Sequence, residues 1–273
     1  MPVLNLTCVS HVWNEGALIT HWLNHHGDLF DRIIFIDHGS TDNTLEDIWL
    51  AQTLSFFSAE IIVIPSRLTD FHAASNDLEV MEVEKKFYLG DQATFVLNTT
   101  EFIWAADFRN KIEAHFNRVG PNRALGVGSI IMVDKEPSET VEYPFWKTRT
   151  HGFVDSYPGV RRKRYFHNAP CGEYGLGRHV TNVPAEDIED VHLLYLAFSP
   201  WPQVAARKLA IQSRIPQADK DIGAGKEHIL TPESLEARYQ DYLGQSYNLL
   251  ARHEFAEAYF RNLELLESQE DQH

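Results

Sequence analysis

Alternating strand and helix patterns near the N-terminus constrain the fold more than any other feature of this sequence. Residues 3–9, 33–36 and 61–64 are rich in β-branched and other apolar side chains, as is typical of strands buried on both faces of a parallel sheet. Between them, residues 17–26 and 45–52 carry apolar side chains at helical spacing. This order predicts an α/β fold with a doubly wound, mainly parallel sheet.

Later segments show the same two periodicities. They are a helix at 71–88, strands at 95–97, 129–133 and 191–196, and a helix at 200–213 that Ser199 caps. Residues 151–182 show little periodicity and are crowded with Gly, Pro, Tyr, His and Arg. Long irregular stretches inside a compact domain usually serve a function, so we expect this one to contribute to a site.

The C-terminal residues 231–273 are predicted to form a helical hairpin after a main domain of residues 1–230. The hairpin has the spacing of a single tetratricopeptide-like unit: Leu243-Gly244-x-x-Tyr247, then Ala256 and Phe260. One such unit cannot bury its apolar face alone. We therefore expect the hairpin to pack on the main domain, and a docking site for a protein partner is the alternative.

Charge and cysteine content narrow the class of protein. The formal net charge of −15 argues against a nucleic-acid partner, because phosphate binding requires a basic face. Two cysteines, Cys8 and Cys171, do not make a disulfide framework and are interpreted as reduced thiols. There is no recognisable signal peptide, and no apolar run approaches the roughly 20 residues that span a bilayer. We expect a cytoplasmic protein with no membrane span.

Polar residues follow two of the predicted strands. The loop 37–44 begins with Asp37 at a strand end and leads into a helix N-terminus, an arrangement that can bind a nucleoside and an anionic group. Turn formation and helix capping by Ser40 or Asp42 is the alternative explanation. The second stretch, residues 95–104, presents polar residues at the edge of the sheet where open α/β folds bind ligands.

Two further candidates lie in the second half of the chain. His192 falls inside an apolar strand, where a lone histidine is more often a core residue than a metal ligand. The basic cluster 161–164, which includes Arg161 and Arg164, stands out in an acidic chain. It is either a solvated turn or part of a binding site for a diphosphate.

The order of the motifs is itself informative. They are Val12-x-Asn14-Glu15, Trp22-Leu23-x-His25-His26, Ile36-Asp37-x-Gly39-Ser40-Thr41-Asp42-x-Thr44, Asn98-Thr99-Thr100-Glu101-Phe102, and His192-Leu193-Leu194-Tyr195 with Ser199 and Lys208. Over roughly residues 3–230 this order resembles the family 2-like glycosyltransferases with the GT-A fold. The resemblance implies a GT-A-like sheet and transfer of a sugar from a nucleotide diphosphate donor to a glycan or other hydroxyl acceptor.

The resemblance also implies roles for individual residues. Those expected to bind the donor are Glu15, Asp37, Ser40, Asp42, Asn98, Thr100, Glu101, Arg161 and Arg164. His192 matches a late histidine that can complete the shell of a divalent metal, Mn²⁺ or Mg²⁺, together with Thr100. The family motif D-x-D-E-F reads N-T-T-E-F here, so neutral oxygens replace the carboxylates that such hard ions prefer.

Three explanations of this departure are open. Glu101 supplies the acid from the adjacent position, although the alternation of side chains along a strand disfavours this. Alternatively, the enzyme works without metal and uses Arg161 to Arg164, Arg178 or His179 to neutralise the leaving diphosphate. In the third explanation activity is lost, and the chain is a nucleotide-sugar-binding or scaffold protein that acts through its C-terminal helices.

An inverting transfer requires a carboxylate that takes the proton of the acceptor hydroxyl. The candidates are Asp155 and Glu173, both in the irregular segment. Glu173 stands in a glycine-rich loop that is able to close over a substrate. Each acid is equally well explained as a surface residue of a loop.

Overall fold

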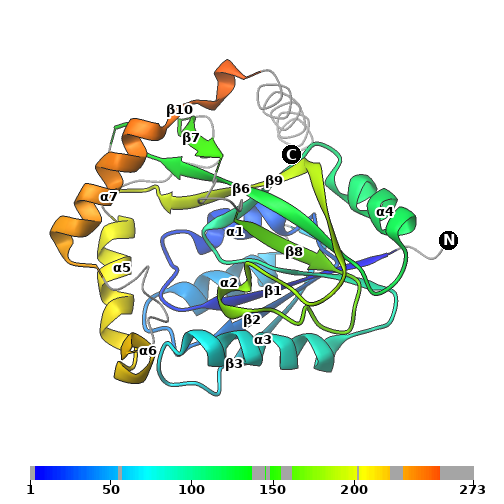
Figure 1. The fold of residues 1–273 in the computed structure, drawn as a ribbon. Helices are drawn as coiled ribbons and strands as arrows, with labels where there is room; N and C mark the ends of the chain where they lie inside the picture. Colours follow the sequence, from blue (N-terminus) through cyan, green and yellow to red (C-terminus); the bar gives the residue numbers. More distant parts are fainter. Residues whose placement is uncertain are drawn as a thin grey trace.

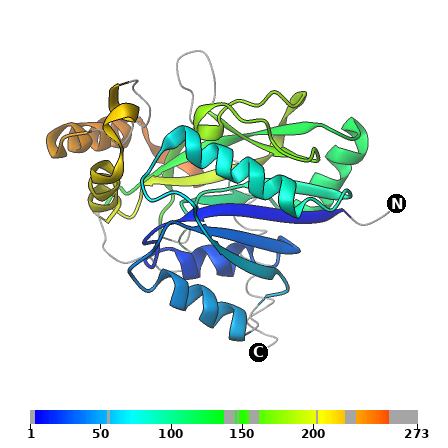
Figure 2. The ribbon, with the colours of Figure 1, turned by 90° about the horizontal axis from the view of Figure 1, so that it is seen from below.

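The computed structural model describes residues 4–54, 57–136, 145, 148–154, 162–201, 203–221 and 230–252. Within them a ten-stranded sheet carries helices on both faces (Figures 1 and 2). The strands are β1 (Asn5–Val12), β2 (Arg32–Asp37), β3 (Glu60–Pro65), β4 (Gln92–Val96), β5 (Glu101–Trp104), β6 (Ala124–Val133), β7 (His151–Val154), β8 (Lys163–His167), β9 (Ala185–Phe198) and β10 (Tyr247–Asn248). The α-helices are α1 (Ile19–His26), α2 (Thr44–Leu54), α3 (Ala73–Phe87), α4 (Phe108–Val119), α5 (Gln203–Arg214), α6 (Gln217–Asp221) and α7 (Pro232–Gln245), with short 3₁₀ turns η2 (Leu176–Arg178) and η4 (Leu249–Ala251).

The sheet is parallel in its N-terminal half and mixed beyond it. β3, β2, β1 and β4 lie side by side and run parallel. β8 then pairs antiparallel with β4 and with β6, and β7 and β10 continue the sheet antiparallel. The long strand β9 pairs parallel with β6 and antiparallel with the short strand β5. The predicted α/β class with a doubly wound parallel core is confirmed.

Side chains of the parallel strands alternate between two apolar cores. Leu6 and Cys8 of β1 face α1 and α2, whereas Val9 faces α3, where it meets Val80 and Val83. Figure 2 shows the sheet nearly edge-on, with α1 and α2 on one side and α3 on the other. The period-2 alternation of a strand therefore decides which helix each polar residue at a strand end can approach.

The histidines of α1 hydrogen-bond to the backbone of β5. His25 Nε2 lies 2.7 Å from the carbonyl oxygen of Ile103, and the N–H of Ile103 donates to His26 Nε2 at 3.2 Å. The indole N–H of Trp22 donates to the Glu101 carbonyl at 3.0 Å. Three side chains of the Trp-Leu-x-His-His motif thus satisfy backbone groups of β5 that no neighbouring strand reaches. These hydrogen bonds fix the position of β5 and therefore that of its first residue, Glu101.

The described part of the C-terminal region packs on the main domain. Leu235 and Tyr239 of α7 are buried against β6, β9 and α5, and the Tyr239 hydroxyl donates to the Asp134 carbonyl at 2.6 Å. α7 ends at Gln245, and Tyr247 lies in β10, paired with β7, rather than in a helix. The second helix of the expected hairpin, with Ala256 and Phe260, lies outside the described residues.

The helices of the described ranges are too short, or not apolar enough, to cross a bilayer.

Candidate functional site

The loops after β1 and β2 bind each other at the carboxyl edge of the sheet. Asp37 ends β2, and its carboxylate accepts hydrogen bonds from the backbone N–H groups of Gly39 and Ser40, each at 3.1 Å. Asn14 joins the two loops, because its N–H donates to Ser40 Oγ at 3.1 Å and its Oδ1 accepts from the Thr41 N–H at 2.8 Å. The predicted donor residues Asp37 and Ser40 therefore lie together and shape this loop.

Asp42 lies two residues before Thr44, the first residue of α2, and ties that helix to the loop before α1. Its Oδ1 accepts from the N–H of Thr44 at 3.0 Å, and its Oδ2 accepts from the N–H of Gly16 at 3.0 Å. Burial raises the pKa of Asp42, but hydrogen bonds from the Thr44 hydroxyl and N–H and from Gly16 outweigh it, so the pKa is lowered from its ordinary value. Asp42 is a charged capping residue at a helix N-terminus, which matches the capping explanation.

Helix α5 brings two arginines to the same edge. Arg207 pairs with the buried carboxylate of Glu15. Arg214 donates to the carbonyl of His38 at 3.3 Å, and its guanidinium stacks over the Trp13 ring at 4.3 Å. Neither arginine was assigned to the site from the sequence. The two lie seven positions apart on one helix, and no local sequence pattern shows which residues lie opposite that helix.

The turn between β4 and β5 contains the N-T-T-E-F motif, which the resemblance assigns to donor and metal binding. Glu101 is buried, and its Oε2 accepts from the backbone N–H of Asn98 at 2.8 Å. Its Oε1 accepts from the guanidinium Nε of Arg164, also buried, at 2.7 Å. Burial lowers the pKa of Arg164, but the Glu101 charge and hydrogen bond raise it above its ordinary value. Glu101 and Arg164 thus form an internal ion pair that fixes the turn.

Arg178 reaches the same turn from the irregular segment. Its Nη2 donates to Asn98 Oδ1 at 2.9 Å, and its Nη1 pairs with Asp77 of α3 at 2.8 Å. Asp77 also accepts from the N–H of Gly177 at 2.7 Å, and Arg164 donates to the Gly177 carbonyl. Among the described residues, the buried Nε of Arg178 has no hydrogen-bond acceptor. The irregular segment therefore places a guanidinium at the tip of β4.

Thr100 and His192 occupy different levels of the β5–β9 ladder. The carbonyl of Thr100, a buried residue, accepts from the N–H of Leu196 at 2.8 Å. His192 pairs with Trp104 at the far end of β5. Four residues of β9 separate Leu196 from His192, which corresponds to about 13 Å along a strand. The structure brings Thr100, Asn98 and Glu101 together and leaves His192 apart from them.

The Mn²⁺ or Mg²⁺ implied by the resemblance does not fit the turn between β4 and β5. Such ions require hard, preferably charged oxygen ligands. Asn98 Oδ1 accepts a hydrogen bond from a cation, Arg178, and both oxygens of Glu101 accept from Arg164 and Asn98. The guanidinium of Arg178 thus lies where a metal would need an anionic ligand.

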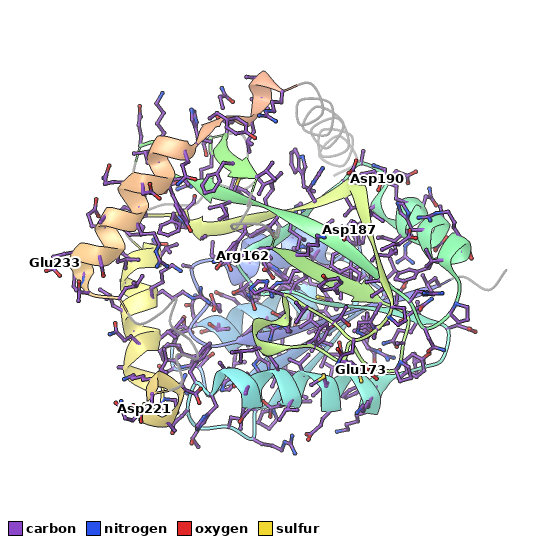
Figure 3. All side chains as sticks on the ribbon, in the orientation of Figure 1. Arg162, Glu173, Asp187, Asp190, Asp221 and Glu233 are labelled. Carbon is purple, nitrogen blue, oxygen red and sulfur yellow. The ribbon has the colours of Figure 1, made fainter. Side chains whose placement is uncertain are left out.

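Of the two candidate bases, Glu173 lies away from this turn. Glu173 is exposed and lies in the irregular segment above α3 (Figure 3). It lines a hollow of about 410 Å³ with Met81 and Lys85 of α3. The same hollow includes Asn122, just before β6, and so lies toward the opposite end of the sheet from Asn98. Asp155 and Arg161 lie outside the described residues.

No protein-family model and no curated protein matches the sequence. Among solved structures, a mannosyltransferase from Pyrobaculum calidifontis in complex with GDP-Man and Mn²⁺ is 14% identical, with a TM-score of 0.45 over 93% of this chain and 74% of its own. TarS 1–349 of S. aureus is 12% identical, with a TM-score of 0.44 over 94% and 72%. Its complex with UDP aligns over 50% of this chain, with 12% identity and a TM-score of 0.38, and this chain spans only 39% of its length. These TM-scores lie below 0.5, and the likenesses do not assign a family.

Proposed function

We propose that this chain is a nucleotide-sugar-dependent glycosyltransferase that moves a sugar, with inversion, to a glycan or other hydroxyl acceptor. In this proposal the donor diphosphate is neutralised by Arg178 and not by a metal at the turn between β4 and β5. The observation that carries it is the hydrogen bond from Arg178 to Asn98, which sets a guanidinium at the strand tip where the sequence lacks its carboxylates.

Arg178 has the chemistry that a metal-free transfer requires. A departing nucleoside diphosphate carries negative charge, and a guanidinium binds phosphate oxygens through charge-assisted hydrogen bonds. Asp77 and Asn98 hold two of its nitrogens in place, so the cation is preorganised before the leaving group develops charge. The third nitrogen, Nε, is buried and has no acceptor among the described residues, so a diphosphate oxygen would bind the remaining N–H of Nη1 or Nη2.

The donor nucleoside is proposed to bind at the joined loops after β1 and β2. Glu15, Asp37, Ser40 and Asp42 meet there through hydrogen bonds within and between the two loops. The parallel strands β1 and β2 end at that edge, which is where open α/β sheets bind ligands. Glu173 lies toward the opposite end of the sheet from Asn98, so the base that takes the acceptor proton is proposed to be Asp155. Transfer is expected to be lost in Asp155→Asn and retained in Glu173→Gln.

A second candidate is a protein that binds the nucleotide sugar without turnover. It is favoured by the internal use of the acids at the strand ends, since Asp42 caps a helix and Glu101 pairs with Arg164. Each carboxylate oxygen of these two acids already accepts a hydrogen bond, so neither acid is free to bind a metal or to take a proton. In this candidate the donor pocket is kept and the acceptor step is absent.

An assay of sugar transfer and donor hydrolysis, with a panel of uridine and guanosine diphosphate sugars, tests the proposal. Each donor is supplied once with EDTA and once with Mn²⁺. The proposal expects turnover of at least one donor in EDTA, with little gain from Mn²⁺. Nucleotide binding without turnover supports the second candidate. Absence of both binding and turnover overturns both.

A further inference from the structure

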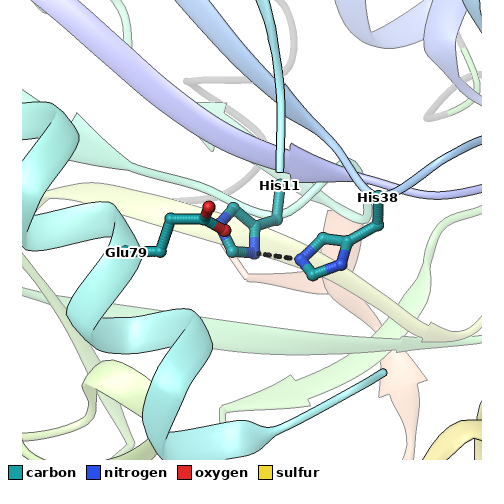
Figure 4. A group of neighbouring side chains, drawn as sticks. All are labelled: His11, His38 and Glu79. Atoms are coloured by element: carbon teal, nitrogen blue, oxygen red, sulfur yellow. Dashed lines mark hydrogen bonds and ion pairs between the residues drawn. The ribbon is translucent and has the colours of Figure 1, made fainter. Parts of the chain in front are cut away.

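Three side chains that sequence reasoning did not connect meet beyond the ends of β1 and β2. They are His11 near the end of β1, His38 just after β2, and Glu79 of α3, and their potential ligand atoms all lie within 4.8 Å of one another (Figure 4). His38 and Glu79 are buried, and the side chain of His11 is 12% exposed. In the described part of the chain this is the one such group of histidine, cysteine and acidic side chains.

The meeting follows from strand periodicity. Val9 and Ile36 face the α3 side of the sheet, so His11 and His38, each two residues further along, face the same side. His11 is paired with Ile36 in the parallel register of β1 and β2, so the two imidazoles project over the same edge. Glu79 immediately precedes Val80, which packs against these strands from α3.

The separation of the two imidazoles suits a shared tetrahedral ion. His11 Nδ1 and His38 Nε2 share a hydrogen bond at 3.2 Å (Figure 4), which a bound ion would replace. Two nitrogens bound to one tetrahedral Zn²⁺ at about 2.0–2.1 Å must lie roughly 3.3–3.4 Å apart. A carboxylate oxygen of Glu79 lies within 4.8 Å of a ring nitrogen of each histidine, and its Oε2 is 3.6 Å from the other ring nitrogen of His11, Nε2.

Supporting groups hold the carboxylate in place. The hydroxyl of Ser66 and the N–H of Arg67 donate to the two oxygens of Glu79, each at 2.7 Å. Ser66 Oγ also lies 3.5 Å from His38 Nε2. Outer groups of this kind orient ligands in established metal sites, and their loss weakens binding 10- to 100-fold.

We propose that His11, His38 and Glu79 bind one divalent transition-metal ion of the zinc type. Two imidazoles and a carboxylate form a ligand set that Zn²⁺ accepts, with the fourth position open to water or an anion. Hard ions such as Mg²⁺ are disfavoured, because two of the three ligands are nitrogens. The site adjoins the turn between β4 and β5, because Val9 of β1 pairs with Val96 of β4, but it uses none of the residues of that turn. The proposal stands whether or not the chain transfers sugars.

Equilibrium dialysis against Zn²⁺, with the bound metal quantified by mass spectrometry, tests the proposal on the full chain. Wild type is expected to retain one equivalent more than His38→Ala or His11→Ala. The affinity of each variant is expected to fall by more than the roughly 10- to 100-fold that loss of a supporting group costs. Co²⁺ is expected to give the intense visible bands of a four-coordinate ion in wild type and to lose them in the variants.

The matched control is His115→Ala, because His115 pairs with Asp190 on the surface and is one of 14 histidines that can bind ions adventitiously. This variant is expected to retain the full equivalent. Glu79→Gln, which keeps the size of the side chain, tests the carboxylate if an alanine variant fails to fold. Equal Zn²⁺ retention in wild type, His11→Ala and His38→Ala would overturn the proposal, as would no retention by folded wild type.

Discussion

Asn98 Oδ1 accepts a hydrogen bond from Arg178 Nη2 at 2.9 Å, across 80 residues of sequence. The contact joins the tip of β4 to the part of the irregular segment that lies between β8 and β9. It gives that tip a positive charge where the related motif would present carboxylates to a metal. Asp77 holds the same guanidinium from α3, so the cation is fixed by two separate elements.

The buried ion pair of Arg164 and Glu101 is expected to contribute strongly to stability. Arg164→Ala leaves the Glu101 carboxylate buried without its cation and should lower the free energy of unfolding by about 3–5 kcal/mol. Arg118→Ala is the control, because Arg118 pairs with Glu186 on the surface, where solvent screens the pair and its loss should change stability little. Urea denaturation at pH 7 measures both. Similar losses in the two variants would contradict the assignment of Glu101 and Arg164 as a fixed structural pair.

Stability is expected to fall with acid partly through His25. Burial lowers its pKa from 6.5 to about 4, with the hydrogen bond to the Ile103 backbone opposing that shift. The unfolded state therefore binds more protons between about pH 6.5 and 4, so stability decreases as the pH falls through this window. His25→Gln removes the titrating group, and its urea midpoint should fall less than that of wild type between pH 7 and pH 4.5. Parallel curves would refute the prediction.

Gly16 is expected to tolerate a side chain poorly. A Cβ at this position would lie 2.0 Å from Oδ1 of the exposed Asn43 side chain and 3.0 Å from Asp42 Oδ2, so Gly16→Ala should displace Asn43 and cost about 1 kcal/mol. Gly244→Ala in α7 is the matched control, because a Cβ there meets nothing within 4 Å. It should be neutral or stabilising by up to about 1 kcal/mol. Thermal unfolding compares the two, and an unchanged midpoint in Gly16→Ala would be inconsistent with the loop geometry.

Restoring the acids of the strand-tip motif is expected not to create a manganese site. In Asn98→Asp combined with Thr100→Asp, the first new carboxylate lies beside Arg178 and should pair with it. Calorimetric titration of Mn²⁺ should therefore show no binding beyond that of wild type. Adding Arg178→Gln to the double variant removes the competing cation and serves as the comparison. A strong Mn²⁺ site in the double variant itself would show that Arg178 does not occupy this position.

Sequence patterns predicted the parallel core well, because strands buried on both faces are continuous apolar runs. Helix α4 was not predicted, although Phe108, Ile112 and Phe116 are buried at helical spacing. Its preceding residue Asp107 adopts a left-handed conformation, and its side chain does not cap the helix. The local signal that marks a helix start is therefore missing.

Candidate site residues were predictable only where they follow a strand end. Asp37, Ser40 and Asp42 were found in this way, and they do meet the loop after β1. The pairing of His11 with His38 was missed, although strand alternation and parallel register together place both on the α3 face. Arg178 was named only as one of several possible cations for the diphosphate, and Arg207 was not named. Their positions depend on long-range packing of the irregular segment and of α5, which no local periodicity encodes.

Calorimetric binding of UDP and GDP in the presence of EDTA tests the central claim most directly. If Arg178 takes the place of a metal at the strand tip, wild type should bind at least one of these nucleotides without divalent ions. Arg178→Gln should weaken that binding about tenfold or more, as expected for loss of a charge-assisted contact of 1.5–3 kcal/mol, while Arg118→Gln leaves it unchanged. Binding that requires Mn²⁺, or that is equally strong in folded Arg178→Gln, would contradict the claim.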